Sequence, residues 1–89
     1  MESGAIPPQP GREDVDALLS LAQHVLVSGS LDPMSQASVE ARVKMMLAEL
    51  DRPEPRLDLV RTWGRGVRDL LITVAHPTVR AALEALPWP

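Results

Sequence analysis

The sequence predicts an all-α domain: a small antiparallel bundle of three main helices plus a short C-terminal helix. Apolar residues recur at spacings of three and four through each long segment, which is the period of a helix with one buried face. No segment alternates as a half-buried strand does. The length of 89 residues suits one domain with a single modest core, and small domains gain stability from a partner.

The chain begins with a segment rich in proline and glycine. Residues 1–11 include Pro7, Pro8 and Pro10, so this segment lacks the backbone donors that a helix needs. We expect residues 1–11 to form a flexible tail and residues 12–89 to form the single helical domain. Pro7 and Pro10 also match the pattern of a polyproline ligand, an alternative that depends on this pair alone.

Residues 12–27 predict the first helix. Acidic residues occupy its first turn, where the positive end of the helix dipole favours them. Gly29 suits the left-handed position that ends a helix. Asp32 and Pro33 then suit the N-cap and first position of the next helix, because Asp accepts a hydrogen bond from a free amide and Pro has no amide hydrogen. The expected core residues of the first helix are Val15, Leu18, Leu19, Ala22, Val25 and Leu26.

Residues 33–51 predict a second helix that is apolar on two opposite faces. One face, suited to the core, holds Val39, Val43, Met46, Leu47 and Leu50. The opposite face holds Met34, Ala37, Ala41, Met45 and Ala48. A lone small domain needs only one such face buried, so the second face predicts contact with another chain. The alternative is that the fourth helix or the segment around Trp88 covers this face within one chain.

Residues 56–75 predict the third helix, with a broad apolar face that we expect to touch two neighbours. Gly64 and Gly66 lie at opposite edges of that face, where we expect the backbones of flanking helices to approach closely. The alternative is a break in the helix here, with a loop that binds an anion. After His76 and Pro77 a short helix follows. The apolar residues of the third and fourth helices are Leu57, Leu59, Val60, Trp63, Val67, Leu70, Leu71, Val74, Val79, Ala82, Leu83 and Leu86.

A ridge of arginines follows the third helix on the side away from its apolar face. It consists of Arg61, Arg65, Arg68 and an isoleucine that we expect to be exposed, Ile72. Residues 1–51 carry three basic against eight acidic residues, whereas residues 52–80 carry six basic against three acidic residues. The ridge is therefore either a solvated face, a contact for an acidic protein partner, or a nucleic-acid-binding surface. The net charge of −3 and the lack of aromatic stacking residues count against nucleic acid.

The composition and the residue spacings give no sign of a catalytic site, a metal site or a membrane segment. The chain has no cysteine, which suits a reducing compartment, and no stretch approaches the roughly 18 apolar residues of a membrane span. His24 and His76 have no second histidine at ligand spacing, so we expect solvent-facing or capping roles for them. The serines lack a nearby base with an orienting partner. We expect no enzymatic activity, no cofactor, no bound metal, no small-molecule substrate and no membrane contact.

These observations together predict a non-catalytic protein–protein interaction module that acts by helix–helix packing. We expect a cytoplasmic adaptor, chaperone or assembly factor that binds itself as a homodimer, another protein, or both. The expected interface is the second face of residues 33–51, and the arginine ridge is the second candidate surface. The alternative function is a nucleic-acid-binding helical module that uses the ridge.

Overall fold

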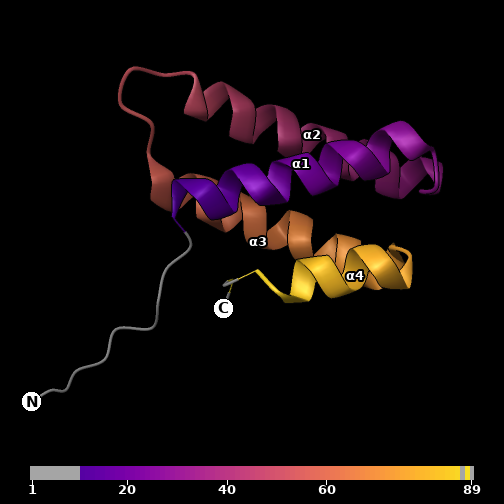
Figure 1. Cartoon of the computed structure of the whole chain (residues 1–89). Coiled ribbons are helices and arrows are strands. Elements are labelled where there is room, and N and C mark those ends of the chain that lie inside the picture. Colours follow the sequence, from indigo (N-terminus) through magenta and orange to yellow (C-terminus); the bar gives the residue numbers. More distant parts are fainter. Residues whose placement is uncertain (1–10, 87, 89) are drawn as a thin grey trace, which may run out of the picture.

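The computed structural model describes residues 11–86 and residue 88, and it is all-helical over them (Figure 1). The elements are α1 (Arg12–Ser28), α2 (Pro33–Leu50), α3 (Leu57–Val74) and α4 (Pro77–Glu84). The predicted fold class is confirmed: three main helices are followed by a short C-terminal helix. The expected tail lies outside the described residues except for Gly11, whose carbonyl oxygen accepts a hydrogen bond from the amide of Val15 at 3.1 Å.

Consecutive helices run in opposite directions, as the short links between them require (Figure 1). In that view α2 forms the upper edge of the bundle and α4 the lower edge, with α1 and α3 between them. α3 packs against α1, α2 and α4, whereas α2 and α4 do not touch. We expected α3 to contact two neighbouring helices. It contacts three, because α4 folds back onto α3 after the turn at His76.

The core lies between α1, α2 and α3 and is closed at one side by α4. It is built of aliphatic side chains, which pack at helical spacing without polar atoms to satisfy. All six apolar residues expected for α1 contribute to the core. The buried residues of the cluster are Val15, Leu18, Leu19, Ala22, Val25, Val39, Val43, Met46, Val60, Val67, Leu71, Leu83 and Trp88.

Three of the predicted helix boundaries have the expected physical cause. Gly29 has φ of 68°, the left-handed conformation that ends α1. Asp32 caps α2, since its Oδ2 accepts a hydrogen bond from the amide of Ser35 at 3.1 Å. His76 caps α4, where its Nδ1 accepts from the amide of Thr78 at 3.3 Å. The expectation of a solvent-facing or capping role for His76 is confirmed, since it is an exposed N-cap.

α3 is continuous through Gly64 and Gly66, so the alternative of a broken helix with an anion-binding loop was wrong. Gly64 is buried, and a Cβ built on it would lie 2.7 Å from Trp88 Cζ2 and 3.1 Å from Leu18 Cδ2. A Cβ on Gly66 would lie 3.2 Å from Arg42 Nε. The glycines do lie at close crossings, but the neighbours that approach them are side chains rather than helix backbones.

Two residues assigned to the core are on the surface. Leu47 of α2 and Val74 of α3 are exposed, at 42% and 37%. Leu47 lies at the edge of the apolar face of α2 that the helix period defines. Val74 ends α3, beside the turn into α4. Periodicity alone overestimated the width of the buried face at these two positions.

Candidate protein interface

The second apolar face of α2 is open to solvent along its whole length. Its five residues are all exposed, and we call them the outer face of α2: Met34, Ala37, Ala41, Met45 and Ala48. Met34 is 83% exposed and Met45 is 45% exposed. Val39, Val43 and Met46 are buried on the opposite side, against α1 and α3. The helix thus uses one apolar face inside the bundle and presents the other outward.

No described part of the same chain covers the outer face. α4 contacts α1 and α3 and not α2. Trp88 is buried elsewhere: its Nε1 donates to the carbonyl oxygen of Arg61 at 3.2 Å, and its ring lies against Gly64. The alternative in which the fourth helix or the Trp88 segment shields this face was therefore wrong. These two contacts hold Trp88 on α3, away from the five residues of the outer face.

Charged side chains border the outer face. Glu40 and Lys44 are exposed and lie one turn apart on the same edge. Arg42 lies on the other edge, where its NH1 donates to the carbonyl oxygen of Ser38 at 3.3 Å and its Nε lies beside Gly66. The apolar strip is thus flanked by a mixed-charge edge and by an arginine that leans toward α3.

The arginine ridge of α3 differs from the expected exposed surface. Ile72 is only partly exposed and packs against the core, so the expectation that its side chain is exposed was wrong. The side chain of Arg68 is 17% exposed, and its NH1 lies 3.4 Å from Asp69 Oδ1. Arg61 is half-buried and Arg65 is exposed, and both interact with other groups. α4 packs on α3, and the Nε1 of Trp88 donates to the carbonyl oxygen of Arg61, so the ridge is less open than the helix period predicts.

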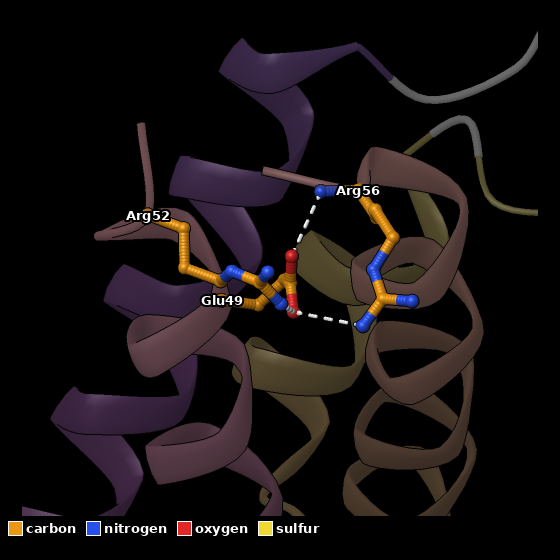
Figure 2. Close-up of polar contacts among 3 residues, drawn as sticks. All are labelled: Glu49, Arg52 and Arg56. Atoms are coloured by element: carbon orange, nitrogen blue, oxygen red, sulfur yellow. Dashed lines mark hydrogen bonds and ion pairs between the residues drawn. The ribbon is translucent and has the colours of Figure 1, made fainter. Parts of the chain in front are cut away.

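A buried carboxylate that the sequence did not single out joins α2 to α3 (Figure 2). Glu49 is 6% exposed. Its Oε2 accepts a hydrogen bond from the backbone amide of Arg56 at 2.9 Å. Its Oε1 lies 3.4 Å from Arg52 NH1 and 3.7 Å from Arg56 NH2. The only signal in the sequence was the spacing of three between Glu49 and Arg52, which is common on exposed helices.

These contacts favour the charged form of Glu49. The hydrogen bond from the Arg56 amide, followed by the charges of Arg52 and Arg56, lowers its pKa from the ordinary value of 4.5, against the opposing effect of burial. The same contacts join the end of α2 to the residue that precedes α3. An open hollow of about 510 Å³ lies over this connection, lined by Arg52, Pro53, Glu54 and Arg56.

Within residues 11–86 and 88 the structure shows neither a metal-binding cluster nor a membrane-spanning helix. No three His, Asp or Glu side chains of this part lie together as a metal would require. His24 is exposed on α1, whereas His76 is the N-cap of α4, so the two histidines belong to different elements. None of the four helices is both long and apolar enough to cross a membrane.

Comparison with protein-family models, curated proteins and solved structures gave no match to this chain.

Proposed function

We propose that this protein is a non-catalytic, cytoplasmic interaction module, an adaptor, chaperone or assembly factor that acts by helix–helix packing. It forms a homodimer through the outer face of α2. The observation that carries the proposal is the exposure of this face: five apolar side chains lie in a row with no charged residue among them, and Met34 is 83% exposed. Contiguous apolar surface of this kind is typical of protein contacts.

The chemistry of the face suits a helix as its partner. Alanines at three of the five positions allow two helices to approach closely, and methionine side chains adapt to irregular surfaces. Fully burying one methionine side chain contributes about 1.5–3 kcal/mol, and a homodimer buries the same residues twice. Part of this gain offsets the entropy lost on association. A single helix pair covers less than the standard interface of about 1,600 Å², so we expect reversible, concentration-dependent dimerisation.

A single charged substitution tests the proposal. In sedimentation velocity or light scattering, the wild type should shift from monomer mass toward dimer mass as its concentration rises. Ala41→Glu should remain monomeric, because it places two carboxylates at the centre of the contact. The matched control is Ala17→Glu, the same substitution at an exposed position of α1, which should dimerise as the wild type does. A wild type that keeps its monomer mass at all concentrations would refute the homodimer.

Nucleic-acid binding through the arginine ridge has weaker support. The net charge is −3, and the side chain of Arg68, one of the three arginines on which it depends, is 17% exposed. Binding to phosphates requires accessible basic groups, whose counterion release supplies most of the affinity. The outer face of α2 therefore remains the basis of the proposed function.

A further inference from the structure

The positions of the outer face of α2 are spaced symmetrically about Ala41, whereas the sizes of the side chains on the two sides are complementary. Met34 and Ala48 each lie seven residues from Ala41, and Ala37 and Met45 each lie four residues from it. In each of these pairs a methionine on one side of Ala41 corresponds to an alanine on the other. A surface of this symmetry is matched by its own copy when that copy runs in the opposite direction.

We propose that the occupant of this face is a second copy of the same helix, antiparallel, with a twofold axis passing beside Ala41. This inference rests on the proposed homodimer and specifies its geometry. Met34 then lies level with Ala48 of the second copy, and Met45 with Ala37. Every large side chain faces a small one, which is how two helix surfaces fill space without voids or overlap.

The parallel arrangement fits less well. Residues of the same number would meet, so Met34 would oppose Met34 and Met45 would oppose Met45. These bulky pairs would hold the helices apart at Ala41, where the two backbones should come closest, and would leave a gap there. Antiparallel helices also place the positive end of each dipole beside the negative end of the other.

The charges at the border of the face favour the same arrangement. Glu40 and Lys44 lie on one edge, and a twofold axis across the helices brings this edge of both copies together. Lys44 of one copy is then displaced along the helix by only about 3 Å from Glu40 of the other, so two symmetric ion pairs form. Arg42 lies on the opposite edge, where the same symmetry would bring two like charges together. Its side chain instead leans toward α3 of its own subunit, beside Gly66.

Disulfide crosslinking tests the geometry, and the absence of cysteine in the chain makes single-cysteine variants unambiguous. Ala41→Cys should form a covalent dimer on mild oxidation, since its two copies lie across the axis. Met34→Cys should not crosslink to itself, because its two copies lie about 21 Å apart along the helix, whereas a disulfide joins Cα atoms about 4.4–6.8 Å apart.

A mixture of two single-cysteine variants tests a contact that the antiparallel arrangement does predict. Met34→Cys protein, carrying an affinity tag, should form a mixed disulfide with untagged Ala48→Cys protein, detected on a non-reducing gel and by mass spectrometry. Ala17→Cys, exposed on α1, reports the level of random collisional crosslinking.

The outcomes separate this inference from the proposed function. If Met34→Cys crosslinks to itself as well as Ala41→Cys does, the homodimer stands and the antiparallel arrangement is wrong. If the protein sediments as a dimer but none of these variants crosslinks above the Ala17→Cys level, the dimer uses another face and the inference is wrong. If the wild type is monomeric at every concentration and Ala41→Cys does not crosslink, both proposals are wrong.

Discussion

Replacing Gly64 with alanine sets two physical effects against each other. Glycine inside a helix costs about 1 kcal/mol relative to alanine, so propensity alone predicts that Gly64→Ala stabilises the protein. The structure predicts the opposite. The added Cβ would lie 2.7 Å from Trp88 Cζ2, 3.1 Å from Leu18 Cδ2 and 3.3 Å from Met46 Cε. The first distance is too short for any real contact, and it involves a rigid ring.

The magnitude follows from these contacts. Trp88 cannot yield by a rotation of a flexible end, because its ring is buried and its Nε1 is held by the carbonyl oxygen of Arg61. Overpacking a well-filled core costs about 1–3 kcal/mol. After the gain in helix propensity is deducted, we expect Gly64→Ala to lower the free energy of unfolding by about 1 kcal/mol.

Gly66 provides a matched control in the same helix. A Cβ at this position would meet Arg42 Nε at 3.2 Å and Arg42 Cδ at 3.7 Å. These atoms belong to a long, flexible side chain that can move aside at little cost. Gly66→Ala should therefore keep most of the propensity gain, and its Tm should exceed that of Gly64→Ala by about 10 °C.

The assay is urea and thermal unfolding followed by circular dichroism, at a protein concentration low enough to favour the monomer. A double-mutant cycle identifies the cause. Trp88→Ala alone should destabilise the protein, whereas Gly64→Ala in the Trp88→Ala background should be neutral or stabilising because its main obstacle is gone. If Gly64→Ala is as stable as Gly66→Ala, or if the cycle shows no coupling with Trp88, the steric reasoning is wrong.

Two further predictions concern the carboxylates that the fold uses. The pKa of Glu49 is lowered in the folded protein, so its stabilising effect is complete above the ordinary pKa of 4.5 and is lost as the pH falls through the lower folded value. Glu49→Gln should therefore lower the Tm at pH 7, and its Tm should converge with that of the wild type in acid; parallel curves from pH 7 to pH 2 would contradict this. Asp32→Ala should lower the Tm by removing the acceptor for the Ser35 amide, and Asp32→Asn should retain most of the stability, as measured by calorimetry. Equal Tm values for the alanine variant and the wild type would show that this cap contributes nothing.

The helices and their limits could be predicted from the sequence because they have local causes. The apolar spacing of Leu18, Leu19 and Ala22, the left-handed glycine at position 29 and the cap at Asp32 act within a few residues along the chain. The outer face of α2 could be found in the same way, since the helix period alone places Met34, Met45 and the three alanines together. The sequence thus determined the fold class, the element boundaries and the location of the candidate interface.

The tertiary structure alone decided which surfaces stay open. The outer face of α2 is exposed because α4 packs on α3 and Trp88 fills the space above Gly64, and both contacts join residues far apart in sequence. Ile72 is partly buried and packs against the core, which its position on the helix did not predict. Glu49 is buried because the connection to α3 brings the Arg56 amide back to it, seven residues later. Helical periodicity gives the direction of a side chain, but burial depends on what lies opposite, and only the packed bundle determines that.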